Sequence, residues 1–465
     1  MNEKRQERKQ PGFLPAFYNL AYSIFGILYL PVFFQRLKQA ENPKKLLAER
    51  FGFLPAASTL SPSQSASKWV WIHAVSVGEV MAVRSFLEGF LDRFPEDRIL
   101  LTTVTPTGQK VAKTLASRRV HPAYFPFDFA VSCRQFFKKW KPRCVFLVET
   151  EIWPNFLMEA EKARVPVGII NARLSEKSAR RYGKIRPLFR PLLERLSFVL
   201  AQTQEDAARF LSLGVSPDRI EVLGNMKFDN VFCASADFQG NSALRRKWEF
   251  NLEDLIWIAG STHPGEEKQL TGIFCDLRRE YPSLKMILAP RHIERSPGLA
   301  EEIRRRGLSV RLSSQSGNPH FDVLLLDQWG ILKNLYQIAD VVFMGGSLVK
   351  RGGQNPIEAA SFRKAVVHGP FVFNFQNIYQ TFDREGGALE VKDARDLAAV
   401  LKRILADESE RSKCGNRAFE IVREFQGAAR RHLLWIENFL VTSSQERIHD
   451  VDVHAKLFSP SGRRG

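Results

Sequence analysis

The sequence has few cysteines, and none of them are paired in a metal-binding or redox spacing. The five cysteines are Cys133, Cys144, Cys233, Cys275 and Cys414, and no two of them form a C-x-x-C motif. This pattern excludes a cysteine-ligated zinc site and is typical of a reducing compartment. The nine histidines contain no H-x-x-x-H pair, so we expect neither a bound metal ion nor a resident cofactor. Internal repeats and long low-complexity tracts are also missing.

Basic residues outnumber acidic ones by 68 to 50, which gives a formal net charge of +18. Such a balance calls for an acidic partner, and no nucleic-acid-binding motif is present to make that partner DNA or RNA. An anionic membrane surface or a phosphorylated substrate is therefore favoured. Hydrophobic residues make up 44% of the 465 positions, which excludes wholesale disorder. A chain of this length predicts two globular domains.

The segment Phe13–Phe34 is apolar and lies in a stretch without charge between Lys9 and Arg36. Its length is close to the roughly 20 residues that a helix needs to cross a bilayer. A cleaved signal peptide is disfavoured because no small-residue cleavage site follows. Basic residues flank the segment on both sides, so two alternatives stay open: a helix that spans the membrane, or one that lies in the cytoplasmic leaflet.

From Trp69 onward, short apolar runs alternate with helical segments, which is the pattern of parallel sheets covered on both faces. The first set of predicted strands is 70–73, 99–104, 123–127, 144–149, 165–171, 198–203 and 220–224. After a polar stretch, a second set follows at 255–261, 284–290, 322–327, 341–347, 365–369 and 388–391. We predict an α/β protein with two Rossmann-like doubly wound domains, facing across a cleft that holds the ligand.

The predicted domain boundaries follow these changes in pattern. They are a membrane anchor with its basic flank at 1–50, a Ser-, Ala- and Pro-rich linker at 51–68, a first domain at 69–235 and a second at 236–428. A helix at 429–442 is expected to cross back onto the first domain. Residues 443–465 are expected to form a disordered basic tail.

The stretch Trp69–Val80, with sequence WVWIHAVSVGEV, runs from a buried strand through a small-residue turn into a helical segment. It places the carboxylate of Glu79 at a strand exit, where open α/β sheets bind ligands. A carboxylate within hydrogen-bond reach of a hydroxyl can act as a general base. The competing interpretation is that Glu79 only favours the positive end of the helix.

Three further motifs of the first half fall at strand exits. TPTG (105–108) and NARLS (171–175) have the composition of helix caps, whereas ETEIWPN (149–155) adds the carboxylates Glu149 and Glu151. GNMKFD (224–229) places Lys227 near the predicted hinge, where its charge is suited to a departing phosphate. Each motif alone also fits capping or solvated surface, but all of them are expected at one edge of the sheet.

In the second half, AGSTHPGEE (259–267) ends a strand and opens a helix, where backbone N–H groups can receive a phosphate. APRHIER (289–295) places Arg291 just past a buried strand, in a position suited to a phosphate contact or to a solvated charge. The longest signal is VVFMGGSLVKRGGQNPIEAA (341–360). Its glycines allow close approach of backbone donors to a phosphate, and Glu358 is placed to accept ribose hydroxyls.

These motifs together resemble the 3-deoxy-D-manno-octulosonic acid (Kdo) transferases of Gram-negative bacteria. The resemblance covers nearly the whole chain through HAVSVGE, TPTG, ETEIWPN, NARLS, GNMKFD, AGSTHPGEE, PRHIER and GGSLVKRGGQNPIE. It implies the GT-B fold and the transfer of Kdo from CMP-Kdo to lipid A precursor (lipid IVA) without a metal. It further implies a location at the cytoplasmic face of the inner membrane, against its anionic leaflet. Members add different numbers of Kdo residues, and the sequence does not select among them.

The resemblance also implies roles for individual residues. It makes Glu79 the general base of an inverting single displacement, and Glu149 and Lys227 the stabilisers of the transition state. The implied CMP-binding residues are Pro290, Arg291, Trp329, Gly330, Ile331, Asn355, Pro356, Ile357 and Glu358. One position departs from the family pattern, because Ile331 stands where that pattern has an acidic residue. Trp329 also replaces a more flexible residue and is suited to stacking on cytosine.

Two other classes of function compete with this interpretation. A sugar-nucleotide epimerase of the same architecture would consume a UDP sugar and need neither a lipid acceptor nor a membrane segment. A non-catalytic, membrane-tethered binding protein would be expected to lack the base, yet Glu79 stands in an intact motif. The predicted anchor Phe13–Phe34 argues against the first of these alternatives.

Overall fold

The computed structural model describes Tyr18, Leu37 and residues 41–53, 68–231, 238–315 and 320–457. The predicted membrane segment Phe13–Phe34 therefore lies outside the described residues, apart from Tyr18. In the described ranges, no helix combines the length and the apolar character needed to cross a membrane. The hydroxyl of Tyr18 donates a hydrogen bond to Asp128 Oδ2 over 2.8 Å.

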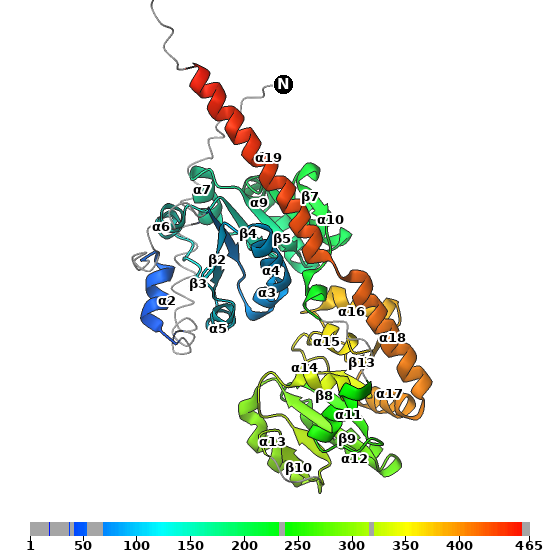
Figure 1. Ribbon diagram of the computed structural model, residues 1–465. Coiled ribbons are helices and arrows are strands. Elements are labelled where there is room, and N and C mark those ends of the chain that lie inside the picture. Colours follow the sequence, from blue (N-terminus) through cyan, green and yellow to red (C-terminus); the bar gives the residue numbers. More distant parts are fainter. Residues whose placement is uncertain are drawn as a thin grey trace, which may run out of the picture. The chain divides into compact units, whose positions relative to one another are not determined.

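The chain divides into two compact units. Unit 1 comprises Met1–Asn230 together with Gly427–Gly465, and unit 2 comprises Val231–Gln426. The first unit thus ends at Asn230, a few residues before the boundary predicted at 235, and takes up the C-terminal segment of the chain. Each unit contains a seven-stranded sheet in which all neighbouring strands are parallel. This confirms the predicted α/β class with two parallel sheets (Figure 1).

The sheet of unit 1 has the strand order β3-β2-β1-β4-β5-β6-β7. Its strands are β1 (Lys68–His73), β2 (Asp97–Thr103), β3 (Val120–Tyr124), β4 (Cys144–Val148), β5 (Val167–Ala172), β6 (Phe198–Ala201) and β7 (Ile220–Val222). The chain moves outward from β1 to β3 and then returns to place β4 on the other side of β1. The reversal between β1 and β4 is a topological switch point, where the connecting loops diverge and leave room for a ligand.

The helices of unit 1 cover both faces of its sheet (Figure 1). They are α2 (Pro43–Arg50), α3 (Val77–Ala82), α4 (Arg84–Arg93), α5 (Pro106–Thr114), α6 (Ala130–Trp140), α7 (Pro154–Lys162), α8 (Glu176–Lys184), α9 (Arg186–Leu193), α10 (Gln204–Leu213) and α19 (Ala428–Leu457), with short 3₁₀ turns η2 (Pro217–Arg219) and η3 (Met226–Asn230). Alternate residues of β1 enter two separate cores. Trp71 packs with residues of α6, α7, α9 and α10, whereas Val70 and Ile72 pack with residues of α4 and α19.

Residues 43–50 belong to the body of unit 1 rather than to an anchor and its flank. Asn42 caps α2 by accepting the N–H of Lys45. The buried carboxylate of Glu49 accepts the N–H of Tyr124 at the end of β3 over 2.8 Å. The predicted linker at 51–68 likewise begins with Phe51 packed against Phe127 and ends with Lys68 in β1.

Unit 2 repeats the same architecture with the strand order β10-β11-β9-β8-β12-β13-β14. Its strands are β8 (Leu255–Thr262), β9 (Leu284–Pro290), β10 (Val310–Leu312), β11 (Val323–Leu325), β12 (Val341–Met344), β13 (Ala365–His368) and β14 (Ala388–Glu390). Its helices are α11 (Phe238–Lys247), α12 (Glu267–Glu280), α13 (Ser296–Arg304), α14 (Leu332–Leu335), α15 (Ile357–Ala360), α16 (Gln376–Arg384), α17 (Ala394–Ala406) and α18 (Glu408–Phe425), with 3₁₀ turns η4 (Ile293–Arg295) and η5 (Tyr336–Ile338). The switch point of this sheet lies between β8 and β12.

The helix α19 returns to unit 1 and continues further than expected (red in Figure 1). Ile436 and Leu440 are buried in the core under α4, and Trp435 and Phe439 pack on Phe198 of β6. The backbone stays helical to Leu457, where a disordered tail had been expected. Residues 443–457 contain neither proline nor glycine, so no residue in this stretch interrupts a helix.

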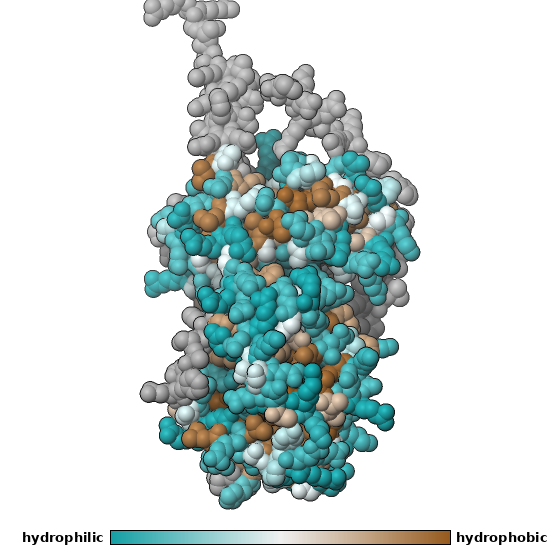
Figure 2. Space-filling model, turned by 90° about the vertical axis from the view of Figure 1, so that its right-hand side faces the viewer, coloured by the Kyte–Doolittle hydropathy of each residue, from teal (hydrophilic) through white to brown (hydrophobic). Residues whose placement is uncertain are grey.

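Most large apolar side chains among the described residues are buried. On the face seen in Figure 2, hydrophilic residues predominate and hydrophobic residues form small separate groups. The exceptions with more than 60% exposure include Trp329, at 63%. An exposed tryptophan at a strand exit is unusual enough to mark a ligand surface rather than a core position.

Candidate functional site

The first part of the site lies at the switch point of unit 1, where Glu79 follows β1. Glu79 is in the first turn of α3, and its Oε2 accepts the N–H of Val75 over 2.6 Å. Its Oε1 accepts the hydroxyl of Ser76 over 3.3 Å. Within the part of the chain that the structure describes, no basic side chain forms an ion pair with Glu79. The carboxylate therefore contributes to the helix start, as the simpler interpretation holds, and also stays available for proton transfer.

Burial and neighbouring carboxylates change the acidity of Glu79. Burial is the main cause that raises the pKa of Glu79 to about 8, followed by the negative charges of Glu149 and Glu151. The Val75 N–H and the charge of Lys227 oppose this rise. A pKa near neutrality suits a general base, because such a group is partly ionised and still accepts a proton readily.

Glu149 and Lys227 form an ion pair beside Glu79. Lys227 Nζ donates to Glu149 Oε1 over 2.6 Å, with the two side chains 14% and 18% exposed. Glu149 follows β4 and has a φ of +63°, in the left-handed region that residues other than glycine seldom adopt. Local strain of this kind is concentrated at functional sites, because surrounding contacts must hold it in place. The Glu149 N–H donates to Ile170 O of the neighbouring strand over 3.1 Å.

A third carboxylate, Glu151, accepts the indole N–H of Trp153 over 2.9 Å. Burial is the main cause that raises the pKa of Glu151 to about 7, and the charge of Glu149 adds to it. The pKa of Tyr182 in α8 is also raised, mainly by burial and then by the charge of Glu151. Glu79, Glu149 and Glu151 thus form a cluster of three carboxylates. Helix α8 lies close to this cluster.

Lys227 is held in place by a network that begins in α19. The Asn171 side chain at the end of β5 accepts the N–H of Met226 over 2.9 Å, and Asn225 accepts the N–H of Lys227 over 3.0 Å. The backbone N–H of Asn171 in turn donates to His432 Nε2 over 3.2 Å. Burial lowers the pKa of His432 to about 4, so its imidazole is neutral and accepts this bond.

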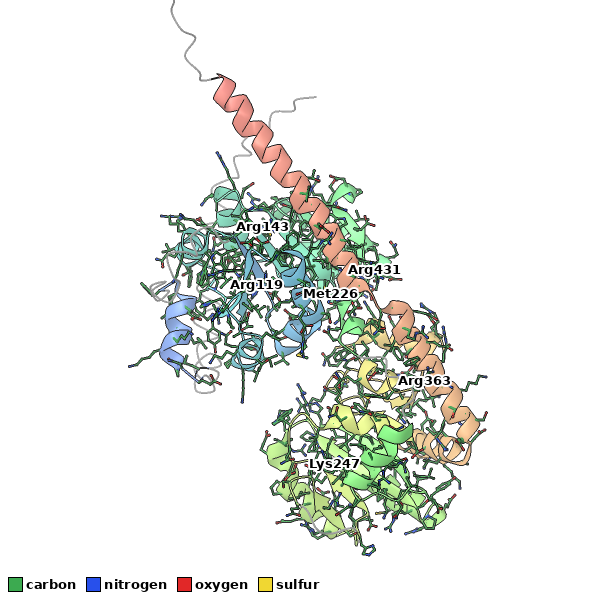
Figure 3. All side chains as sticks on the ribbon, viewed as in Figure 1. Arg119, Arg143, Met226, Lys247, Arg363 and Arg431 are labelled. Atoms are coloured by element: carbon green, nitrogen blue, oxygen red, sulfur yellow. The ribbon has the colours of Figure 1, made fainter. Side chains whose placement is uncertain are left out.

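A second contact joins α19 to the same segment. Arg431, labelled together with Met226 in Figure 3, donates to Leu223 O over 2.8 Å. The sequence pattern marks neither Asn171 as a positioning group nor His432 as its partner. The one sequence feature that points to this contact is the asparagine of NARLS at a strand exit. Asn171 and His432 are 261 positions apart, so no local pattern shows that they meet.

If Glu79 acts as a general base, we expect the activity of the protein to rise with pH as Glu79 ionises. A base with a pKa of about 8 is mostly protonated at pH 7, so kcat/KM should increase through pH 7–8 and level off above about pH 9. The measurement is the initial rate between pH 6 and 9.5 with a soluble acceptor. A rate that is flat or falls over pH 7–8 would contradict the assignment of Glu79 as the base.

The second part of the site lies at the switch point of unit 2. The glycine loop after β12 does not present its N–H groups to a ligand, contrary to the expectation for Gly346. The Gly346 N–H donates to Glu266 Oε2 over 2.7 Å, and those of Ser347 and Leu348 donate to Glu266 Oε1 over 3.1 and 3.0 Å. A carboxylate of the protein itself therefore fills this backbone anion site.

Cationic side chains surround this loop. Burial lowers the pKa of His263, and the nearby charges of His292, Arg351 and Arg291 lower it further. The rings of His263 and His292 meet edge to face with centroids 6.0 Å apart. Among the described residues, neither Arg291 nor Arg351 has a carboxylate partner. The arrangement leaves two guanidinium groups available to an anion at the carboxyl ends of β9 and β12.

Trp329 lies next to Arg291, one of these two arginines. The Arg291 guanidinium carbon is 5.9 Å from the centre of the Trp329 ring. Trp329 precedes Gly330, which has a φ of +87°, and Ile331, whose carbonyl accepts the N–H of Asn334 at the start of α14. This bond gives the Ile331 backbone a role at the start of α14, and its role toward a nucleotide stays a prediction. Pro290 is the last residue of β9 and fixes the exit of the strand toward Arg291.

The segment Asn355–Glu358 opens α15. Asn355 Oδ1 accepts the N–H of Ile357 over 3.2 Å, and Pro356 and Ile357 are buried. Burial raises the pKa of Glu358, while the charge of Lys333 lowers it. In the described ranges the Glu358 carboxylate accepts no hydrogen bond, which leaves both oxygens available to the hydroxyls of a ligand. No three His, Cys, Asp or Glu side chains in these ranges are grouped to hold a metal ion.

Some sequence-predicted motifs have structural roles. Thr105 of TPTG caps α5 by accepting the N–H of Gly108 over 3.0 Å, which is the capping interpretation. Lys350 of the glycine-rich segment has its ammonium 5.8 Å from the ring of Phe371. His263 and Arg351 were parts of quoted motifs but had not been chosen as site residues, because sequence spacing does not show which charges converge.

The comparisons with known proteins agree on one family. Residues 45–230 match the family model of 3-Deoxy-D-manno-octulosonic-acid transferase (kdotransferase). The 3-deoxy-D-manno-octulosonic acid transferase of Haemophilus influenzae is 33% identical over 400 residues, 85% of this chain and 92% of that protein. The enzyme of the same name from Bordetella pertussis is 33% identical over 419 residues, 87% and 95% of the two chains.

Solved structures show a similarity of fold. UDP-GlcNAc 2-epimerase from Neisseria meningitidis has a TM-score of 0.55 and 14% identity, and the match covers 80% of this chain and 99% of that chain. At that identity the similarity shows the GT-B-like α/β fold alone. The Haemophilus and Bordetella enzymes, in contrast, match most of the chain at 33% identity, which shows common family membership. This match supports a glycosyltransferase activity. The chain belongs to the 3-deoxy-D-manno-octulosonic acid transferase family, as its motifs predicted.

Proposed function

We propose that this protein transfers Kdo from CMP-Kdo to a lipid A precursor at the cytoplasmic face of the inner membrane. The observation that supports this most directly is the arrangement at the first switch point. A carboxylate without a basic partner, Glu79, lies beside the Glu149–Lys227 ion pair. An epimerase also needs a base, so the choice of a transferase rests on the relatives, which are Kdo transferases at 33% identity, whereas the epimerase structure is 14% identical.

In the proposed reaction, Glu79 removes the proton of an acceptor hydroxyl. The hydroxyl oxygen forms a bond to the anomeric carbon of Kdo while the bond from that carbon to the CMP phosphate oxygen breaks. Attack from the face opposite the leaving group inverts the configuration and needs no covalent intermediate. The electron pair of the broken bond stays on the phosphate of CMP. Arg291 of unit 2 is proposed to stabilise the negative charge that develops there, and Lys227 of unit 1 is proposed to stabilise the transition state together with its partner Glu149.

The donor contacts are proposed for unit 2. Arg291 and Arg351, with His263 beside them, supply positive charge for the phosphate or the Kdo carboxylate. Glu358 has both carboxylate oxygens available for ribose hydroxyls, and Trp329 offers an exposed ring for the base. The proposal requires no metal ion, because these cations can neutralise the leaving group.

The leaflet contact is proposed for the helices α8 and α9. Residues 176–190 contain the six basic residues Lys177, Arg180, Arg181, Lys184, Arg186 and Arg190 and a single acidic one, Glu176. Ile185 and Leu188 between them are 45% and 41% exposed. Basic side chains around exposed apolar ones are the pattern of a surface that lies on anionic lipid. The ring of Tyr182 stacks on that of Phe189, with the ring centroids 4.2 Å apart, and Tyr182 lies near Glu151. This surface therefore adjoins the cluster formed by the Glu79, Glu149 and Glu151 carboxylates.

We expect charge reversal on α8 to weaken membrane binding. Lys177, Arg181 and Lys184 recur on one face of α8, and replacing all three by Glu should lower partition onto anionic vesicles by roughly 30-fold or more at low salt. Sedimentation with phosphatidylglycerol vesicles measures this. The matched control replaces Lys110, Arg118 and Lys138, exposed cations on other parts of unit 1, and should bind nearly as the parent does. An equal loss of vesicle binding in both triple variants would show that binding depends on net charge alone and not on α8.

The overall activity is tested by incubating the protein with CMP-Kdo and tetraacylated lipid A precursor and weighing the lipid product. Addition of one or more Kdo masses supports the proposal. Conversion of a UDP sugar without a lipid product would instead support an epimerase. Binding of CMP-Kdo without any product would support a non-catalytic carrier.

A further inference from the structure

The carboxylate of Glu266 is completely buried and accepts hydrogen bonds from four backbone N–H groups. Those of Gly346, Ser347 and Leu348 come from the loop after β12, and that of His263 comes from the turn after β8, over 2.9 Å. Glu266 itself is the residue at the N-terminal boundary of α12. One side chain thus ties together the two loops that leave the strands on either side of the switch point.

Each of these two loops supplies one nitrogen-bearing side chain to the proposed donor site. His263 lies in the turn after β8, and Arg351 lies in the loop after β12. A Cβ built on Gly346 would lie 3.1 Å from His263 Cδ2 and 3.4 Å from Arg351 Cβ, so both side chains pack close to this glycine. A change in the position of the Gly346 backbone would therefore alter the distance between the two side chains.

Other contacts leave the loop after β12 little freedom once Glu266 is bonded. A Cβ on Gly345 would lie 2.5 Å from Ser261 O, so the backbone of this loop touches the end of β8. Ser347 Oγ donates to Met344 O and accepts the N–H of Gly369 over 2.8 Å. Asn374 Nδ2 donates to Arg351 O over 2.9 Å. These bonds hold the ends of the loop, and Glu266 holds its centre.

We propose that Glu266 is a positioning residue for recognition of the donor's anionic groups, an inference that rests on the proposed function. By accepting the N–H groups of Gly346, Ser347 and Leu348, it keeps this backbone from binding the phosphate itself. It also sets the spacing of His263 and Arg351, so side chains rather than the glycine backbone hold the anion. The glycines serve to let a protein carboxylate approach, and the ligand contacts come from the side chains around them.

The test is Glu266→Gln, which keeps the shape of the side chain but places an NH₂ group against backbone N–H donors. We expect the Kd for CMP and the KM for CMP-Kdo to rise roughly 10-fold or more, with kcat changed less than about 3-fold. Amide hydrogen exchange at 346–348 should become at least roughly 10-fold faster without ligand. Glu266→Asp keeps the charge on a shorter side chain and should recover part of the affinity, and this comparison remains available if the Gln variant does not fold.

The matched control is Glu267→Gln. Glu267 is equally buried but accepts from Arg295 and Thr262 and does not contact the glycine loop. We expect it to lower the melting temperature while CMP affinity stays within about 2-fold. Parental CMP affinity in Glu266→Gln, or an equal loss of affinity in Glu267→Gln, would overturn the inference. Failure of the proposed function would be seen separately, because the parent protein would then bind another nucleotide in place of CMP. In that case the rate of amide hydrogen exchange at residues 346–348 would still test the role of Glu266.

Discussion

Replacing Glu79 by Gln is expected to reduce kcat by roughly 10²–10⁴-fold while CMP binding stays within about 2-fold. The amide keeps the size of the side chain but cannot take a proton from the acceptor hydroxyl. Donor affinity should survive because the residues proposed to contact CMP belong to unit 2 and share no hydrogen bond with Glu79. Rates are measured with a soluble acceptor at pH 8.5, where the parental carboxylate is ionised, and CMP binding is measured by calorimetry.

The control for this variant is Glu88→Gln in α4. Glu88 is exposed and, among the residues that the structure describes, pairs with Arg84 alone, four residues earlier, over 2.9 Å, so its removal should leave the rate unchanged. The pH profile gives an independent check. If Glu79 is the base, the residual activity of the Gln variant loses the rise through pH 7–8 that the parent shows. Parental activity in Glu79→Gln would remove the base from the mechanism.

Replacing Lys227 by Met is expected to lower kcat by roughly 10²–10³-fold. A preorganised charge that stabilises the charge developing in a transition state is worth about that factor. The substitution also leaves the Glu149 carboxylate without its cation, and Glu149→Gln removes the same pair from the other side. Because the two residues act as a unit, the double variant should be no slower than the slower single variant.

The two single variants should move the pH profile in opposite directions. Lys227 lowers the pKa of Glu79 and Glu149 raises it, so the rise in activity should shift above pH 8 in Lys227→Met and below it in Glu149→Gln. The matched control is Lys162→Met, which breaks a lysine–glutamate pair with Glu159 in α7 and should keep parental rates. Shifts of the same sign in both variants would exclude an electrostatic role of the pair.

Much of the fold follows from the sequence because parallel strands buried on both faces appear as short apolar runs. All thirteen predicted strands are present, and the one that was missed, β10, has three residues with Arg311 at its centre. It lies at the edge of the sheet, where a charged side chain reduces hydrophobic character without preventing pairing. The strand predicted at 123–127 instead begins at Val120, since the register is set by β2 rather than by the most aromatic residues.

The site was less predictable than the fold, because its contacts join distant parts of the chain. Glu149 and Lys227 are separated by 78 positions, and no local pattern shows that they meet. The glycine loop illustrates a different limit. Its glycine-rich composition correctly indicates backbone N–H donors. Only the three-dimensional structure shows that these N–H groups already donate to Glu266. A loop rich in backbone donors therefore does not reveal whether the bound anion is a ligand or a side chain of the protein itself.

The return of α19 to unit 1 has a consequence for how the protein is made. Ile436 and Leu440 complete the core of unit 1 from the far end of the chain, so this core still lacks them when residue 230 leaves the ribosome. The roughly 200 residues of unit 2 are synthesised in the interval, which takes about 10–40 s at typical translation rates. During that time the face that α19 later covers, including Phe198, is exposed to chaperones and to other nascent chains.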